Sequence, residues 1–162
     1  ADLHPPALDD FGLLAALRSY AESFSARAAV PITVHGEDLA PRLSLAAEMA
    51  LFRIAQEALA NAVKHARARN IEVALGAAPE RVTLTIDDDG VGFDAEHTMS
   101  ARRGRRFDDG VGFNTGHPMP AGSHGGLVTM QERADAVGAT LRIESELGRG
   151  VHVIVEVPRR EA

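Results

Sequence analysis

The side chains best suited to bind a charged ligand lie along one predicted helix. They are a carboxylate, an amide, an amine and an imidazole, from Glu57, Asn61, Lys64 and His65. Spacings close to one helical turn place the four groups on one side of the helix. A solvated helix face usually mixes Lys, Glu and Ala without this order, so the line favours a ligand site over a purely structural role.

Each of these groups has a chemistry that suits a ligand made of metal and phosphate. The amide oxygen of Asn61 can bind a hard cation such as Mg²⁺, which prefers oxygen ligands and keeps several waters. One turn earlier, Glu57 can order those waters or move a proton, which makes it the candidate catalytic residue. Lys64 and His65 can donate hydrogen bonds to phosphate oxygens. For His65 alone an ordinary surface histidine is the simpler explanation, but its place beside Asn61 favours the ligand role.

A glycine-bearing segment, residues 88–93, follows a predicted strand at 83–86. Gly90 and Gly92 allow the backbone to approach a flat ligand closely. Asp88 can accept a hydrogen bond from an exocyclic amine, which would select adenine over guanine. Because Asp-Gly is also a common turn dipeptide, the alternative is a plain turn; the second glycine and the position after a strand favour the site.

A second glycine-bearing segment, His124-Gly125-Gly126-Leu127, leads directly into a predicted helix. The free N–H groups and the positive dipole end at the start of a helix can bind phosphate. The alternative is simple helix initiation, which needs no double glycine. We therefore assign these four residues to the phosphate side of the same site.

The helix that carries the polar line is predicted over residues 45–66, with Ser44 as its N-cap. Its opposite face is apolar and should enter a core. That face consists of Leu51, Phe52, Ala55, Ala58, Leu59, Ala62 and Val63. Two more amphipathic helices are predicted over residues 11–28, where Phe11 opens the apolar face, and over residues 127–137.

Four segments alternate with the period of two that is typical of strands. They are residues 71–75, 82–86, 141–143 and 151–157. Turns at 76–80 and 148–150 join them into two hairpins, and Ile32 and Val34 indicate a further short strand. Only one face of each strand is strongly apolar, so a single layer of helices should cover one side of the sheet. The fold class predicted is α+β, a two-layer sandwich.

Residues 94–124 follow neither the helical nor the strand period and are rich in Gly, His, Arg and Pro. A segment of this length without regular structure is usually a functional lid or disordered. We interpret it as a long lid between two halves of the site. Its histidines are too widely spaced to predict a metal centre, and its arginine run is typical of a solvated segment.

Bulk composition excludes several classes of function. With 162 residues, 45% hydrophobic and 25% charged, the chain suits one domain with at most a small appendage. A formal charge of −6 argues against nucleic acid as a partner. The absence of cysteine fits a reducing compartment, and no apolar run is long enough to cross a bilayer, so we expect a cytoplasmic domain, even if the parent protein is anchored in a membrane.

The motifs together resemble a known family. Residues 52–66 resemble the asparagine box of two-component sensor histidine kinases, and residues 88–94 resemble their first glycine box. Residues 125–134 are similar to the second glycine box of the nitrate-sensor subfamily. Residues 5–13, with Pro5-Pro6 and Leu8-Asp9-Asp10, are similar to the second dimerisation helix of that subfamily.

This resemblance implies the Bergerat-type ATP-binding fold shared with gyrase and MutL ATPases. It implies that Asn61 holds Mg²⁺, that Asp88 contacts adenine, and that the lid closes over the phosphates of ATP. Residues 1–30 would then be the remnant of the second dimerisation helix and a linker, and residues 31–160 the catalytic domain. The implied partners are histidine-bearing dimerisation helices and the receiver domain of a response regulator, in a homodimeric parent.

Two departures from the family pattern affect the expected activity. The phosphoacceptor histidine of the family lies on a helix upstream of the segment that this sequence contains; only His4 stands near that segment. We therefore expect ATP binding with little or no autophosphorylation. In addition, His124 replaces the first glycine of the second box, which changes the lid hinge near the phosphates.

A near-copy of the first glycine segment occurs inside the lid. Residues 108–113 repeat residues 88–93, but Arg105-Arg106-Phe107 precedes the copy where an apolar strand precedes the original. By the rule that a motif needs its structural context, we assign the first copy to the adenine site and the second to the lid.

Three functions are compatible with these motifs. The first is the ATP-binding catalytic domain of a sensor histidine kinase, which presents the γ-phosphoryl group to a histidine for relay to a response regulator. The second is a serine kinase of the anti-sigma-factor type, which shares the fold but not the dimerisation-like residues 3–13. The third is a non-catalytic nucleotide-sensing module, which the combination of Glu57, Asn61 and Asp88 disfavours.

Overall fold

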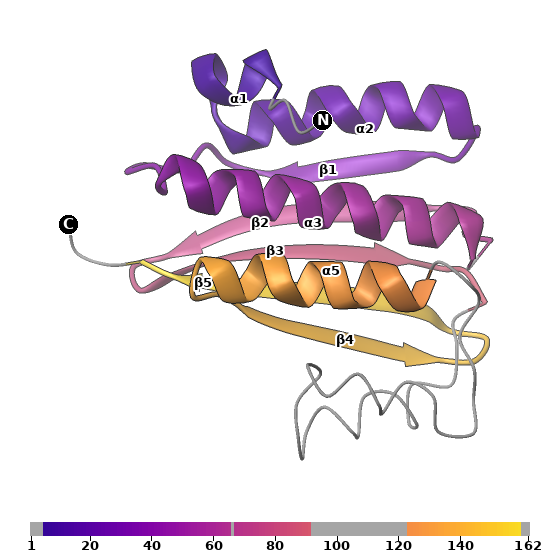
Figure 1. Cartoon of the computed structure of the whole chain (residues 1–162). Helices are drawn as coiled ribbons and strands as arrows, with labels where there is room; N and C mark the ends of the chain where they lie inside the picture. Colours follow the sequence, from indigo (N-terminus) through magenta and orange to yellow (C-terminus); the bar gives the residue numbers. More distant parts are fainter. Residues whose placement is uncertain (1–4, 66, 92–122, 160–162) are drawn as a thin grey trace.

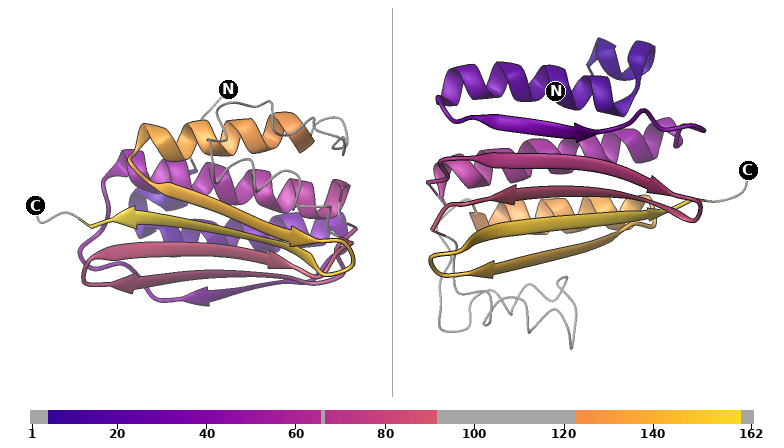
Figure 2. Two further views of the ribbon diagram at one scale, coloured as in Figure 1. Left: turned by 90° about the horizontal axis from the view of Figure 1, so that it is seen from below. Right: turned by 180° about the vertical axis from the view of Figure 1, so that it is seen from behind.

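Five strands form one sheet, and all the long helices lie on one of its faces (Figures 1 and 2). The computed structural model describes residues 5–65, 67–91 and 123–159, with the backbone alone at 123–125 and 146. The predicted lid at 94–124 and the repeated segment at 108–113 therefore lie outside the described residues, apart from the last two lid positions. The two layers confirm the predicted α+β sandwich.

The helix predicted over residues 11–28 forms as α2, Leu13–Ala28, which starts two residues later than expected. Phe11 belongs instead to a separate short helix, α1, Pro6–Phe11, which ends at Gly12. Gly12 has a φ of 94°, which interrupts the helix in a conformation that glycine adopts without steric cost. Phe11 is consequently 70% exposed, so its predicted place on the apolar face is wrong.

The sheet is mixed, as the implied fold requires. Its strand order is β1-β2-β3-β5-β4, and only the pair of β1, Ile32–Gly36, with β2, Ile71–Ala78, is parallel. Strand β3, Arg81–Asp88, is central and pairs antiparallel with both β2 and β5. The C-terminal end of β3 therefore lies between β2 and β5, and the glycine-bearing segment that follows it begins with a strand on either side.

Both predicted hairpins are present, with small differences at their turns. Ala78 pairs with Arg81, so the first turn holds only two residues and Gly76 remains in the strand. Strand β4, Thr140–Glu146, and β5, Gly150–Pro158, enclose a three-residue turn, because Glu146 pairs with Gly150. The second turn thus ends one residue earlier than the sequence predicts.

The long polar-striped helix forms almost as predicted. Helix α3, Leu45–Lys64, begins after Ser44, whose hydroxyl accepts a hydrogen bond from the Ala47 N–H at 3.1 Å. This side-chain bond satisfies one of the free donors at the helix start, as an N-cap does. The predicted apolar face is buried except for Val63, which is half-buried.

Helix α5, Ser123–Ala136, starts four residues earlier than expected. The double glycine lies inside its first turn, so the predicted loop before the helix is wrong at these positions. Two adjacent glycines have a low helix propensity and so predict a break in the helix, but packing of α5 against α3 outweighs this propensity. The helix ends just before Gly138, whose φ is 72°, as the sequence predicts.

One hydrophobic core lies between the helices and the sheet. It includes Leu13, Leu14 and Leu17 from α2, together with residues of α3, α5 and the four longest strands. Helix α2 therefore belongs to the same folded unit as the sheet, while the assignment of residues 1–30 to a dimerisation remnant stays a prediction. In the part of the chain that the structure describes, no helix combines the length and apolarity needed to cross a membrane.

Candidate functional site

The sequence motifs meet at one end of the two-layer sandwich. Figure 1 shows the C-terminal ends of α3 and β3, the N-terminal end of α5 and the β4–β5 turn at the same end of the molecule. These are the elements that carry the polar line and the two glycine segments. The topology thus brings together three motifs that are up to 70 residues apart along the chain.

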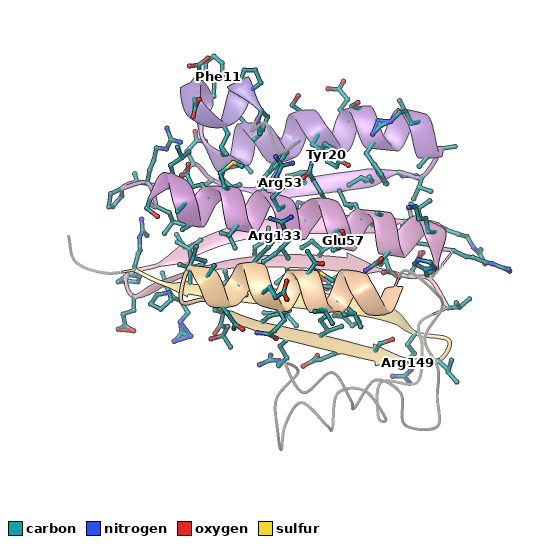
Figure 3. The ribbon with its side chains drawn as sticks, in the orientation of Figure 1. Phe11, Tyr20, Arg53, Glu57, Arg133 and Arg149 are labelled. Atoms are coloured by element: carbon teal, nitrogen blue, oxygen red, sulfur yellow. The ribbon has the colours of Figure 1, made fainter. Side chains whose placement is uncertain are left out.

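Glu57 and Asn61 lie directly against the first turn of α5. A side-chain carbon added at Gly126 would lie 3.2 Å from the Glu57 carboxyl carbon, 3.3 Å from Asn61 Nδ2 and even closer to Glu57 Oε2. Figure 3 places Glu57 between the two helices. Any residue larger than glycine at position 126 would displace these side chains, so the second glycine segment is shaped by the polar line of α3.

Asp88 is the buried acid of the site, with only 8% of its surface exposed. Its Oδ1 accepts hydrogen bonds from the N–H groups of Gly90, at 2.8 Å, and Val151, at 3.3 Å. Both bonds go to the same oxygen, which leaves Oδ2 without a donor among the described residues. A carboxylate held in this way can accept one further hydrogen bond in a fixed direction.

The environment of Asp88 also changes its acidity. Burial raises the pKa of Asp88 above its ordinary value, because the charged form loses water. The N–H groups of Gly90 and Val151 oppose that rise, and so does nearby His152. Burial thus disfavours the ionised form and the backbone donors offset part of that effect, a combination common at functional sites.

Asp89, which the sequence analysis did not single out, joins β3 to the loop after α3. Its Oδ1 accepts from the N–H groups of Arg69, at 2.8 Å, and Asn70, at 2.9 Å. These bonds lower the pKa of Asp89 below its ordinary value. The only sequence signal was the run of three aspartates at 87–89, which does not say which carboxylate faces which loop.

Apart from Gly92, the remaining predicted residues lie at the end of α3 and at the start of α5. Lys64 is exposed at the end of α3, and His65 is its C-cap, with its N–H bonded to the Asn61 carbonyl at 2.9 Å. The Leu127 side chain lies in the hydrophobic core. Only the backbone of His124 and Gly125 is described, within the first turn of α5, and Gly92 lies outside the described residues.

No group of three or more acidic or histidine side chains in the described residues could hold a metal ion by itself. A cation here would need other ligands besides, such as the Asn61 amide and phosphate oxygens, which suits Mg²⁺. The role of Asn61 as a metal ligand stays a prediction.

A separate cavity of about 820 Å³ opens at the opposite end of the molecule. It lies beside the start of α3 and the end of α5, where Ser44, Val137 and Arg159 line it. Arg159 donates to the carbonyls of Pro41 and Ala78, so its charge is already used within the fold. None of the predicted site residues that the structure describes lines this cavity.

The fold and this set of residues place the chain in a known family. Residues 46–161 match the family model of the histidine kinase-, DNA gyrase B- and HSP90-like ATPases, and the chain belongs to that family. The match begins at the start of α3 and includes every predicted site residue.

Curated relatives match over nearly the whole chain. It is 35% identical over 157 residues to the oxygen sensor histidine kinase NreB of Staphylococcus carnosus, covering 97% of this chain and 39% of that protein. It is 34% identical over 157 residues to the signal transduction histidine-protein kinase/phosphatase DegS of Bacillus subtilis, covering 95% of this chain and 36% of that protein. The chain thus spans less than two fifths of these relatives.

Solved structures confirm the fold. The histidine kinase domain of the blue-light activated histidine kinase from Erythrobacter litoralis EL346 superposes with a TM-score of 0.63 at 19% identity, covering 90% of this chain and 64% of that one. The superposition covers a larger share of the chain than the family model, which matches residues 46–161.

Proposed function

We propose that this chain is the ATP-binding catalytic domain of a sensor histidine kinase, working on the cytosolic side of the membrane if its parent is anchored there. The observation that carries the proposal is the Asp88 carboxylate, which is buried and, among the described residues, is bonded through Oδ1. Its Oδ2 can accept a hydrogen bond from the exocyclic amine of adenine. The relatives, both named as histidine kinases, support the class of reaction.

The site residues divide between the two ends of the nucleotide. Asp88, Gly90 and Gly92 would hold the base, because the glycines let the backbone approach a flat ring. The free N–H groups at the start of α5, including that of Gly125, can bind phosphate oxygens and add the positive end of the helix dipole. Gly126 would contribute by letting Glu57 and Asn61 lie close to this turn. The chain therefore offers hydrogen-bonding groups that fit both a purine and its phosphates.

The polar line of α3 would act on the phosphates. Asn61 would bind Mg²⁺ through its amide oxygen, Glu57 would order the metal-bound waters or accept a proton, and Lys64 and His65 would donate to phosphate oxygens. Bound Mg-ATP supplies the γ-phosphoryl group. Catalysis of phosphoryl transfer consists mainly of positioning and charge neutralisation, which this arrangement can provide.

The acceptor would be a histidine on the dimerisation helices of a homodimeric parent, and a response-regulator receiver domain would take the phosphoryl group next. Calorimetry of this chain with ATP, ADP and GTP, with and without Mg²⁺, tests the binding half of the proposal. We expect binding selective for adenine, with triphosphate affinity that depends on Mg²⁺. Equal affinity for GTP, or no binding at all, would contradict it.

A second experiment tests the transfer half. The histidine-bearing helices of a relative are added in trans with labelled ATP, and acid-labile phosphate on the helices is measured, with Asn61→Ala as the inactive control. Transfer supports the kinase. ATP binding without transfer would point to a nucleotide-sensing module, and labelling of serine to a serine kinase of the same fold.

A further inference from the structure

The turn between β4 and β5 contacts the base side of the site at two points. The N–H of Val151 donates to Asp88 Oδ1 at 3.3 Å, and the N–H of Gly148 donates to the carbonyl of Val91 at 2.6 Å. These bonds join residues that lie about 60 positions apart in the sequence. The segment from Asp88 to Val91 is therefore held from outside by a hairpin that carries none of the predicted site residues.

Gly150 is what allows this hairpin to come so close. A side-chain carbon at position 150 would lie 2.9 Å from the carbonyl carbon of Asp88, 3.1 Å from the Asp89 Cα, and would collide with the Asp88 carbonyl oxygen. Its φ of 85° also favours glycine. Since the colliding atoms are backbone, no side-chain rotation could relieve the contact.

The carbonyl of Gly150 is held as well. The buried hydroxyl of Ser145, on β4, donates to it at 3.2 Å. The peptide unit between Gly150 and Val151 is thus held through both of its polar groups, the carbonyl by Ser145 and the N–H by Asp88. This rigidity determines where the Val151 N–H points.

We propose that Gly150 is a positioning residue for base selection, because it brings the Val151 N–H onto Asp88 Oδ1 and so directs Oδ2 toward the exocyclic amine of the base. The inference rests on the proposed function and extends the site to the β4–β5 turn. Guanine carries a carbonyl where adenine carries this amine, and a fixed carboxylate repels it. A carboxylate free to rotate would discriminate less, since either oxygen could turn away.

The test compares Gly150→Ala with Gly138→Ala in this chain. Gly138 has a similar φ of 72°, but a side-chain carbon there would meet nothing within 4 Å, and it lies at the far end of α5. Alanine is therefore strained by the positive φ at both positions, but only at position 150 does its side-chain carbon also collide with backbone atoms. Affinities for ATP and GTP are measured by calorimetry, and Tm is measured for each variant.

We expect Gly150→Ala to lose about tenfold or more in ATP affinity and to lose most of its preference for ATP over GTP. Gly138→Ala should keep both, with a lower Tm. If Gly150→Ala retains the affinity and selectivity of Gly138→Ala, the inference is wrong. If the unsubstituted chain itself shows no adenine selectivity, the proposed function fails first.

A measurement on the unsubstituted chain covers the case in which Gly150→Ala does not fold. The amide resonance of Val151 should shift when ATP is added to saturation, and the shift should disappear in Asp88→Asn. An unchanged Val151 resonance at saturating ATP would overturn the inference without any substitution in the turn.

Discussion

The guanidinium of Arg42 binds the carboxylate of Glu48, which is completely buried near the start of α3. Arg42 Nη2 lies 2.5 Å from Glu48 Oε1, and Nε lies 3.2 Å from Oε2, so the pair is bidentate. The same guanidinium donates to the carbonyl of Leu8 at 2.8 Å. One side chain thus joins α1 to α3, which connects the dimerisation-like segment to the body of the fold.

Removing Arg42 should destabilise the fold by about 2–3 kcal/mol, because Glu48 would keep a buried charge without a partner. We place the value below that of a fully buried pair because Arg42 itself is 43% exposed. Denaturant unfolding of Arg42→Met measures it. The double variant Arg42→Met/Glu48→Leu is the control and should recover much of the loss, since no unpaired charge remains. Unfolding of Arg42→Met at the same midpoint as the original chain would contradict this.

Asp88→Asn should lower ATP affinity by about tenfold or more, because the charge-assisted hydrogen bond to the base is lost. Asp108→Asn, in the repeated segment of the predicted lid, is the matched control and should leave affinity unchanged. Calorimetry with ATP gives both values. If Asp108→Asn instead loses ATP binding and Asp88→Asn keeps its affinity, the adenine site lies at the second copy.

ATP binding should weaken in mild acid. Burial raises the pKa of Asp88, the N–H groups of Gly90 and Val151 together with His152 oppose the rise, and Asp89 adds to it. The carboxylate must be ionised to bind the amine well, so affinity falls as the pH drops through this raised pKa. The fall should begin at a higher pH than a free aspartate would produce, and Asp88→Asn should remove it. An affinity that is constant down to the ordinary aspartate range would show that Asp88 does not contact the base.

The raised pKa of Asp88 has the opposite effect on the stability of the fold: ionisation, which favours ATP binding, disfavours folding. Because the native pKa of Asp88 lies above that of the unfolded chain, the ionised group destabilises the fold above the native pKa, and this cost disappears as the pH falls below the unfolded value. Asp88→Asn should therefore keep or slightly raise the free energy of unfolding at neutral pH while ATP affinity drops. Denaturant unfolding at neutral pH checks it, and a strongly destabilised Asp88→Asn would mean that the charge itself supports the fold.

Gly126→Ala should lower ATP affinity more than it lowers stability. The added carbon would displace Glu57 and Asn61 from the first turn of α5, while alanine improves helix propensity by up to about 1 kcal/mol. Gly76→Ala, where a side-chain carbon would meet nothing within 4 Å, is the control and should leave binding unchanged. Calorimetry and Tm together separate the two effects, and full ATP affinity in Gly126→Ala would show that Glu57 and Asn61 need not lie where the structure has them.

Local patterns were enough to predict the elements that carry the site. The apolar period and Ser44 located α3, alternation located the strands, and one-sided alternation indicated a single covering layer of helices. These predictions succeed because periodicity and capping depend on residues a few positions apart. They failed at Gly12 and at the start of α5, where one backbone angle or the packing of two helices decided the outcome.

The sequence by itself determined which groups are present: an acid directly after an apolar strand, an amide and a carboxylate one helical turn apart, and glycines where the backbone comes close. Only the tertiary structure decided that Val151 holds Asp88, that Gly150 makes room for this contact, and that Arg42 neutralises Glu48 while binding α1. These contacts join distant parts of the chain, and no local propensity encodes them. They depend on how strands pair and helices pack, which brings backbone within hydrogen-bond distance only once the whole sandwich has formed.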